Sequence, residues 1–227
     1  MSLSFSAGTD KALHGDVPSM DGAAAYTWML WIKIVALPPD AVPGGILAKS
    51  VGTHTIVMRA RDVLLDIFMA AGLSTWSSFL SADSWAHVAV VYDGSLVTDA
   101  AKLKVFKDGT QRTGSMGTVP ATLSDSGAAE LTIGYHASAG GGISAKVAHL
   151  KCWSVALTAA EVAGEMNSRR PARTANLVIW VPYDDAVNAR NYSGSGSNHG
   201  TVSGTTAIQV ADSPPVSAGG GPGIFAV

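Results

Sequence analysis

Short apolar runs, separated by turns rich in Gly, Pro and Asp-Gly, make up most of this chain. The clearest example lies between residues 84 and 109, where two consecutive strands are predicted, each closed by an Asp-Gly turn. The first strand, Trp85 to Tyr92, is apolar on both faces, as expected inside a two-layer sandwich. The second, at 102–107, alternates with lysines, which indicates one face near water. This stretch predicts the centre of an all-β fold.

The other predicted strands are recognised by apolar residues at alternate positions or by short, continuous apolar runs. The strand at 27–35 has one fully apolar face and ends at Pro38-Pro39, whereas the polar run from Gly8 to Gly22 predicts no strand. Strands at this spacing, with Gly and Pro between them, favour a sandwich or barrel over alternating strands and helices. The remaining strands are expected at 2–6, 46–49, 55–60, 63–69, 74–81, 131–135, 143–153, 176–183 and 201–210.

One helix is marked, at about 158–167, by the sequence Thr158-Ala-Ala-Glu161. In such a capping box the Thr158 side chain accepts from the Glu161 amide, and the Glu161 side chain accepts from the Thr158 amide. Leu157 and Val162 occupy the two positions of a hydrophobic staple. The apolar side of this helix, which includes Met166, is enough to dock on a sheet but too short to stand alone.

The last residues lack the periodicity of a strand or a helix. From Asp212 the chain reads DSPPVSAGGGPGIFAV, which is rich in Gly and Pro. Such a segment is either disordered or laid along a neighbouring molecule as an extended arm, and its apolar end favours the second interpretation. The predicted organisation is therefore one sandwich domain, 1–211, followed by a C-terminal arm, 212–227.

The composition fits one domain of this kind. A chain of 227 residues has the size of a single all-β domain, and 47% apolar residues are ample for a core. Only 14% of the residues are charged, which suggests that a partner covers part of the surface. The net charge is −2, and the one basic cluster, Arg169-Arg170-Pro171-Ala172-Arg173, is typical of a solvated loop. Nucleic-acid binding is therefore disfavoured.

Cys152 is the only cysteine, so the chain forms no internal disulfide and no cysteine-rich metal site. Its neighbours in the sequence predict an inert, buried thiol. The first residues lack a basic segment followed by an apolar run, so no secretory signal peptide is expected, and no apolar stretch is long enough to span a membrane. We therefore expect synthesis in a reducing cytoplasm.

Four blocks of the sequence resemble the laminin-G-like and concanavalin-A-like family of lectin domains. The blocks are SLSFSAG with YTWMLWIK, the stretch 85–109, LTIGY with GISAKVAHLKCWSVALTAAEVAGEM, and NLVIWVPYDDAVNARNYSGSGSNHGTVSG. The resemblance implies a concanavalin-A-like jelly-roll β-sandwich of two antiparallel sheets, whose central strands are structural. In such domains the fourth block often stands at the N-terminus, whereas in this chain it follows the helix. Because the two ends of the fold lie close together, the block can occupy the same place in the sheet from either end. Where the family usually has Asp before Ser-Gly, this chain has Asn191-Tyr192.

Some members of this superfamily are glycoside hydrolases, which need two acidic side chains flanking the scissile bond. The chain has only three glutamates, Glu130, Glu161 and Glu165, and two of them belong to the predicted helix. Asp184 and Asp185 are adjacent and would point to opposite sides of a strand. The sequence contains no G-x-S-x-G motif and no cysteine in a setting that favours a thiolate. No catalytic residue is assigned, and the prediction is a non-enzymatic protein.

A calcium site is the candidate for a cofactor, because Ca²⁺ takes oxygen ligands that loops supply. Asp184, Asp185, Asn188 and Asn191 lie close together in the sequence. The alternative, which we favour, is a polar turn in which these side chains bond their own backbone. No metal ligand is therefore assigned, and apart from this calcium candidate no cofactor is predicted.

Glycan binding needs exposed aromatic rings with polar neighbours. The candidates are Trp76 and the pair Tyr135-His136, which precedes a glycine-rich loop, although aromatic residues in a sandwich are more often core residues. Specificity is expected in the loops around Gly140 and Asp184 and in the C-terminal arm.

The histidines are dispersed along the chain, at 14, 54, 87, 136, 149 and 199. His87 and His149 fall inside predicted strands and are interpreted as hydrogen-bonded structural residues. His199 lies in a Ser-Asn-His-Gly turn and is expected to bond its own loop.

The predicted function is that of a non-enzymatic structural or recognition protein of a bacteriophage particle, either a capsid decoration protein or a tail- or fibre-associated protein. A self-contained domain without disulfides or a signal peptide favours this role, which implies synthesis in the host cytoplasm and a place on the virion surface. Its partners would be other virion proteins, further copies of itself in a homo-oligomer and a cell-surface glycan, with no nucleic acid and no membrane. The alternative is a carbohydrate-binding, lectin-like module, with or without calcium.

Overall fold

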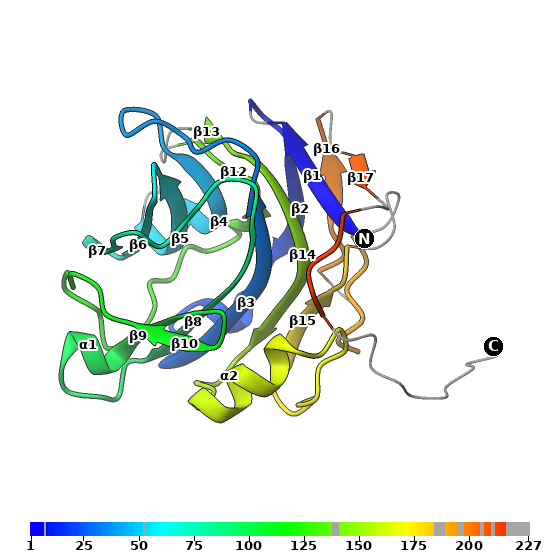
Figure 1. The fold of residues 1–227 in the computed structure, drawn as a ribbon. Coiled ribbons are helices and arrows are strands. Elements are labelled where there is room, and N and C mark those ends of the chain that lie inside the picture. Colours follow the sequence, from blue (N-terminus) through cyan, green and yellow to red (C-terminus); the bar gives the residue numbers. More distant parts are fainter. Residues whose placement is uncertain are drawn as a thin grey trace.

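Two antiparallel β-sheets lie face to face, and a short helix, α2, covers part of the outer side of the first sheet (Figure 1). This arrangement confirms the predicted all-β sandwich. The computed structural model describes residues 1–6, 8–51, 53–137, 141–183, 189–194, 198–204, 207–209 and 212–216.

The first sheet contains the central strands that the sequence predicts. Its order within the described residues is β10-β9-β8-β3-β14-β1-β17, and β15 also pairs with β14. Every pairing in it is antiparallel. The strands are β1 (Ser2–Ser6), β3 (Ala25–Ile34), β8 (Trp85–Asp93), β9 (Leu103–Lys107), β10 (Thr110–Arg112), β14 (Ser144–Trp153), β15 (Leu177–Val181) and β17 (Ala207–Gln209).

The second sheet has the order β16-β2-β11-β4-β5-β6-β7 over the same described ranges, and β4 to β7 follow one another as hairpins. A small separate hairpin is formed by β12 (Tyr135–His136) and β13 (Gly141–Gly142). The strands of the second sheet are β2 (Lys11–Asp16), β4 (Gly44–Val51), β5 (Thr53–Arg61), β6 (Leu64–Met69), β7 (Gly72–Trp76), β11 (Glu130–Ile133) and β16 (Thr201–Ser203).

The core lies between the two sheets and follows from the alternation of side chains along each strand. Trp28, Leu30 and Ile32 of β3 share one buried cluster with Ile56 and Met58 of β5. All five are at most 1% exposed. Each buried side chain of this size stabilises the fold by about 1.5–3 kcal/mol relative to an exposed one. Burial of these two inward faces is therefore what holds the sheets together.

Helix α2 (Ala159–Met166) is capped as the sequence predicts. The Thr158 side chain accepts from the Glu161 amide at 3.2 Å, and Glu161 Oε2 accepts from the Thr158 amide at 2.8 Å. Val162 packs against the outer face of the first sheet in a cluster that includes Trp153 and Phe106. Helices in the described ranges are too short to cross a membrane.

Two short helical elements were not predicted. A 3-10 helix, η1 (Pro18–Met20), follows β2, and a one-turn helix, α1 (Asp99–Lys102), connects β8 to β9. The Thr98 side chain caps α1 by accepting from the Ala101 amide. Elements of this length bury too little apolar surface to leave a periodic signal in the sequence.

Three predicted segments differ from the structure. The polar run from Gly8 to Gly22 contains β2, whose inward side chains are the small Ala12 and the polar His14, so no apolar pattern reveals it. The stretch 201–210 is divided between two sheets, since β16 pairs with β2 and β17 pairs with β1. Gly204, with φ of 93°, lies just after β16. The strand expected at 74–81 instead spans 72–76.

Residues 212–216, red in Figure 1, are attached to the first sheet by hydrogen bonds to Asp212. Asp212 Oδ1 accepts from Trp85 Nε1 at 2.8 Å, and Oδ2 accepts from Lys146 Nζ at 2.5 Å. The Ser2 hydroxyl donates to the Asp212 carbonyl at 2.9 Å. The hydrogen bond from Lys146 is the main reason that the pKa of Asp212 falls to about 2. The start of the predicted arm thus contacts its own domain, while 217–227 lie outside the described residues.

Candidate ligand-binding face

Partly exposed side chains cover the outer face of the second sheet over β5, β6 and β7. Val57 and Arg59 point to this face because their neighbours Ile56, Met58 and Ala60 point into the core. The first sheet offers less open surface, since α2 and residues 212–216 lie on its outer side. The outer face of the second sheet is therefore the better place for a ligand.

The strand register aligns an apolar row across this face. Val57 pairs with Ala48 on one side and with Phe68 on the other, and Phe68 pairs with Leu73. Ala48 and Val57 are buried beneath a half-buried Phe68, whereas Leu73 is 39% exposed. Directly paired side chains on one face lie in contact distance of one another. The row therefore ends in an apolar surface that solvent reaches.

A polar row runs beside the apolar one, two residues further along each strand. Asp66 pairs with Arg59 of β5 and with Thr75 of β7. Its Oδ1 accepts from Thr75 Oγ1 at 2.7 Å, and its Oδ2 accepts from Arg59 Nε at 3.1 Å and from Arg61 Nε at 3.0 Å. The carboxylate therefore fixes three polar side chains in place.

Asp66 is charged despite its burial. Its side chain is fully buried, and desolvation alone would raise its pKa. Hydrogen bonds from Arg61, Thr75 and Arg59 outweigh that effect and hold the pKa of Asp66 below its ordinary value. The Asp66 hydrogen bond correspondingly raises the pKa of Arg61. The polar row thus combines one carboxylate with two guanidinium groups.

The two rows are joined by Arg59 and Phe68. The Arg59 guanidinium carbon lies 4.6 Å from the centroid of the Phe68 ring, within the range of a cation–π contact. Such stacking restricts both side chains. The face therefore presents a preorganised mixture of apolar and hydrogen-bonding groups.

Two histidines lie at the edge of this face. β12 approaches β4 so closely that a Cβ at Gly45 would come within 2.5 Å of the His136 amide nitrogen, so glycine is required there. This approach leaves the His136 and His54 rings 5.9 Å apart, with the Phe68 ring 5.8 Å beyond His54. Burial lowers the pKa of both histidines, and His54 lowers that of His136 further. Below, the platform denotes His54, Val57, Arg59, Arg61, Asp66, Phe68, Leu73, Thr75 and His136.

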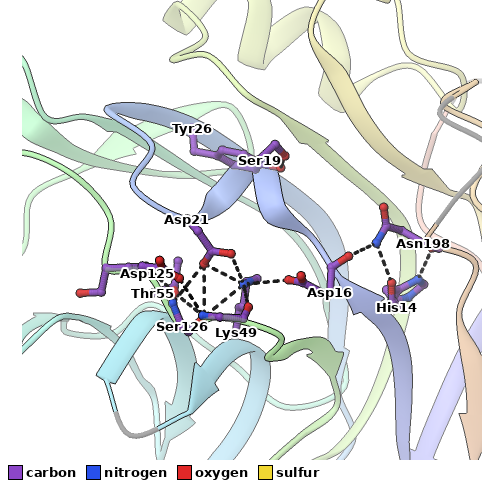
Figure 2. A network of polar contacts seen from close by, with 12 residues as sticks. His14, Asp16, Ser19, Asp21, Tyr26, Lys49, Thr55, Asp125, Ser126 and Asn198 are labelled. Carbon is purple, nitrogen blue, oxygen red and sulfur yellow. Dashed lines mark hydrogen bonds and ion pairs between the residues drawn. The ribbon is translucent and has the colours of Figure 1, made fainter.

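A second polar cluster, shown in Figure 2, is buried at the edge of the core and centres on Lys49. The Lys49 ammonium donates to both carboxylate oxygens of Asp21, at 2.8 and 2.9 Å, and to Ser126 Oγ at 3.1 Å. It also pairs with Asp16 at 3.1 Å and donates to the Gly127 carbonyl at 3.2 Å. The cluster ties β4 to two loops, and the ammonium already occupies its centre, so we interpret it as structural.

The same network continues to the C-terminal part of the chain. Asn198 donates to the carbonyl of His14 at 3.0 Å and to that of Asp16. His14 Nε2 lies 2.6 Å from the Tyr183 hydroxyl, and burial lowers the pKa of His14 to about 4. These contacts attach residues 198–204 to β2.

Of the two candidate positions for glycan-binding aromatics, Trp76 has the core position that was the favoured alternative, and Tyr135-His136 lie at the edge of the platform. Trp76 is 1% exposed and belongs to the core, because β7 turns it inward; its Nε1 donates to the Arg112 carbonyl at 3.1 Å. Tyr135 and His136 are half-buried, and His136 contacts the platform. The Lys11 ammonium lies 5.4 Å from the Tyr135 ring.

Of the four residues of the predicted calcium cluster, the structure describes only Asn191. Asp184, Asp185 and Asn188 lie outside the described residues, as does Gly140. Asn191 is buried, and its Oδ1 accepts from the amides of Trp180 and Ser193. Asn191 therefore has the backbone-bonding role of the alternative interpretation. The described residues hold no group of three or more His, Cys, Asp or Glu side chains suited to a metal.

The remaining histidines and the cysteine are structural. His87 and His149 are 2% and 5% exposed, but Nδ1 of each lacks a hydrogen-bond partner within the described ranges, so the expected hydrogen bonding is incomplete. His199 accepts from the Asn191 amide at 3.1 Å and thus bonds its own loop, as predicted. Cys152 is fully buried, which raises the pKa of its thiol and leaves it inert.

The glutamates do not form a hydrolytic pair. Glu161 caps α2, and Glu165 Oε2 accepts from the buried Lys151 Nζ at 2.8 Å. Glu130 is exposed on β11. On the platform, Asp66 is held by two arginines and a threonine, so it lacks the free lone pairs and the raised pKa of a general acid. This arrangement suits binding better than catalysis.

A further exposed aromatic pair lies at the edge of the first sheet. Tyr192 is 47% exposed, and its ring lies 5.6 Å from that of Trp180. The Arg190 guanidinium lies 5.5 Å from the Tyr192 ring. Among the described residues, we find no row of paired polar side chains beside it like the one on the platform, so it makes a weaker candidate site.

Sequence reasoning missed Arg59, Asp66 and Thr75. A signal was present, because Arg59-Ala60-Arg61 and Leu65-Asp66-Ile67 place charged side chains inside otherwise apolar strands. Charged residues are rarely buried unless they are paired. Their pairing depends on the register between β5 and β6, which the local pattern does not specify.

Residues 6–163 match the model of the Concanavalin A-like lectin/glucanases superfamily. The match covers more than half of the chain, so the chain belongs to this superfamily, and the resemblance seen in its sequence is confirmed. The fourth resembling block, 176–204, lies beyond the matched residues. No curated protein matches the chain.

Solved structures show the same fold at low sequence identity. A presumed carbohydrate-binding protein from Bacteroides ovatus superposes with a TM-score of 0.66 at 18% identity, covering 91% of this chain. The chain spans only 60% of the length of that protein. A heptameric SAP-like pentraxin from Limulus polyphemus gives a TM-score of 0.52 at 15% identity, covering 76% of this chain and 83% of its own. At these identities the likeness concerns the fold alone.

Proposed function

We propose that this member of the Concanavalin A-like lectin/glucanases superfamily is a non-catalytic carbohydrate-binding protein whose ligand lies on the platform. The observation that carries the proposal is the pair of adjacent rows, Val57-Phe68-Leu73 and Arg59-Asp66-Thr75, in register across three strands. A sugar ring has an apolar C–H face and a rim of hydroxyl groups, so it matches one row of each kind. The name of the Bacteroides ovatus protein is consistent with such a ligand.

Each row has a distinct task in this proposal. Phe68 and Leu73 take the C–H face of the sugar out of water, as apolar walls do in small-ligand sites. Arg59 and Thr75 supply oriented polar groups to the sugar hydroxyls, and Asp66 keeps both in place. Preorganisation of this kind reduces the entropy that binding would otherwise cost.

The test is a glycan array followed by calorimetry with the strongest ligand. Leu73→Ala should weaken binding by about fivefold, because it removes apolar contact area from the platform. Val97→Ala is the matched control, since Val97 is 92% exposed in the connection between β8 and β9 of the first sheet. Equal affinity of Leu73→Ala and the unmutated protein would contradict a ligand on the platform.

Calcium dependence is checked in the same assay. The platform offers guanidinium N–H donors and the Thr75 hydroxyl oxygen as an acceptor, beside a carboxylate that is already bound, so a sugar can be held without a metal. We expect the same affinity with and without a chelator. A loss of affinity in the chelator would instead implicate the Asp and Asn residues between 184 and 191.

Attachment to a virus particle, with further copies of the chain as partners, is a second proposal. It is supported by the charged fraction of only 14% and by a lone, buried cysteine. In addition, Asp212 binds side chains of the first sheet. The platform lies on the second sheet, so residues 212–216 lie on the opposite side of the molecule. A partner bound there would leave the platform free. Co-sedimentation of the chain with purified particles, with and without residues 217–227, tests this role.

A further inference from the structure

Two arginines share one buried carboxylate on the platform. Asp66 Oδ2 accepts from Arg59 Nε at 3.1 Å and Nη2 at 3.0 Å, and from Arg61 Nε at 3.0 Å. The Asp66 side chain is fully buried, whereas those of Arg59 and Arg61 are 18% and 27% exposed. Asp66 thus contacts two positively charged side chains, and the exposed Asp40 offsets part of the remaining charge at Arg61.

Part of each guanidinium group remains open to a ligand. In the part of the chain that the structure describes, Arg59 contacts Asp66 through Nε and Nη2, and Arg61 uses Nε for Asp66 and Nη1 for Asp40. Arg61 Nη1 donates a long hydrogen bond of 3.4 Å to Oδ1 of the exposed Asp40. A fixed guanidinium group presents planar N–H donors that match the two oxygens of a carboxylate.

The surroundings add to this positive character. Lys11 lies against the Tyr135 ring at the His136 side of the platform. Burial lowers the pKa of His54 and His136, which disfavours a positive charge on either ring. Arg59 also stacks on Phe68, so an anion at the arginines would lie beside the apolar row.

We propose that the saccharide bound by the platform carries a carboxylate, and that Arg59 and Arg61 bind this group while Phe68 and Leu73 contact the sugar ring. This inference rests on the proposed carbohydrate-binding function and names the class of sugar. Asp66 acts as a positioning residue that holds both guanidinium groups in place beside the apolar row. A uronic-acid residue has the required chemistry, because its carboxylate replaces the neutral hydroxymethyl group of the parent hexose.

The experiment compares matched pairs of oligosaccharides, oligogalacturonate with oligogalactose and oligoglucuronate with oligoglucose, by calorimetry at low and high salt. We expect the acidic member of a pair to bind more than about tenfold tighter, because charge-assisted hydrogen bonds are the strong ones. High salt should reduce this preference. Arg59→Gln and Arg61→Gln should each reduce it, while Arg112→Gln, an exposed arginine of β10 in the first sheet, should leave it unchanged.

Each other outcome has a separate meaning. Equal affinity for the acidic and neutral members would overturn the carboxylate inference and leave the proposed function standing. Stronger binding of a sulfated oligosaccharide than of either uronate series would also overturn it, because the planar match to a carboxylate would then be irrelevant. Binding of neither member of either pair would contradict the carbohydrate-binding function itself. Leu73→Ala separates the two ideas further, since it should weaken both members of a pair equally.

Discussion

Arg59 and Asp66 are direct partners across β5 and β6, with Arg59 Nε and Nη2 3.1 and 3.0 Å from Asp66 Oδ2. An arginine side chain on an open sheet would otherwise lose considerable rotamer freedom when it binds a ligand. Because Asp66 has already fixed Arg59, that loss is incurred during folding and not during binding. The buried carboxylate therefore connects the stability of the second sheet to the recognition proposed for it.

Replacement of Asp66 by Asn should damage both stability and binding. The substitution removes a buried charge that two arginines and Thr75 require, so we expect the free energy of unfolding to fall by about 2 kcal/mol. Urea unfolding measures the loss, and calorimetry should show weaker saccharide binding. Asp62→Asn is the control, because Asp62 is exposed in a turn at φ of 51°, which Asn adopts readily. A stable Asp66→Asn protein with full affinity would remove the basis of the positioning role.

The Lys49 cluster should affect stability alone. Lys49→Met leaves the carboxylates of Asp21 and Asp16 without their cation, and loss of one partner from a buried ion pair costs about 3–5 kcal/mol. Thermal and urea unfolding should show a loss of this order, while saccharide affinity is retained. Lys104→Met, a half-buried lysine on β9, is the matched substitution and should change stability little. A Lys49→Met protein that folds normally but no longer binds sugar would assign the cluster a functional role.

Acid should destabilise the protein through its buried histidines. Burial lowers the pKa to about 4 for His14 and to about 3 for His87 and His149, and Lys151 lowers the last two further. The unfolded chain has histidines with a pKa near 6.5, so it binds more protons than the folded chain below that value. Stability is therefore complete above about pH 6.5 and declines as the pH falls toward 4.

Urea unfolding at pH 7.5, 6.0 and 5.0 measures this decline. Each buried histidine can contribute up to about 1.4 kcal/mol per pH unit in the window. His87→Gln should make the dependence shallower, whereas His199→Gln should change it less, because His199 is exposed and only a minor influence on the pKa of His14. The same slope in the unmutated protein and in His87→Gln would show that His87 is not held neutral by the fold.

Asp212 should control the attachment of residues 212–216. Asp212→Asn removes the ion pairs to Lys146 and Lys33, so we expect faster amide exchange and faster proteolysis in this segment. The pKa of Asp212 is lowered to about 2, so the attachment is complete above the ordinary carboxyl pKa near 4 and weakens as the pH falls toward 2. Saccharide affinity should not change, because the platform lies on the other sheet. Unaltered exchange in Asp212→Asn would mean that other contacts hold the segment.

The sequence predicted the sandwich well where burial is two-sided and periodic. The strand predicted at Trp85 to Tyr92 corresponds to β8, and the capping box predicted at Thr158 and Glu161 caps α2. Both predictions were correct because both signals are local in the sequence. It failed at β2, whose inward residues Ala12 and His14 are not strongly apolar. It also failed where 201–210 leaves one sheet for the other, because the pattern of a strand does not say which sheet it joins.

The candidate site was harder to predict than the fold. His136 was identified because an aromatic residue beside a glycine loop is visible in the sequence. Arg59 and Asp66 were not, since their role depends on being register partners, and a shift of one residue would have placed them on opposite faces. Trp76 could not be placed from the sequence alone, and the structure gives it the core position that is more common for aromatic residues in a sandwich.

The most direct test of the central claim is a two-dimensional NMR titration of the isotope-labelled protein with a uronate oligosaccharide. A ligand on the platform predicts that the largest shift changes occur at the amides of Arg59, Phe68, Leu73 and Thr75, with little change near Val97. The Arg59→Gln protein should show smaller changes at the same positions. Shift changes confined to Trp180 and Tyr192, or to the residues flanking 184–188, would contradict the claim and place the ligand at the edge of the first sheet.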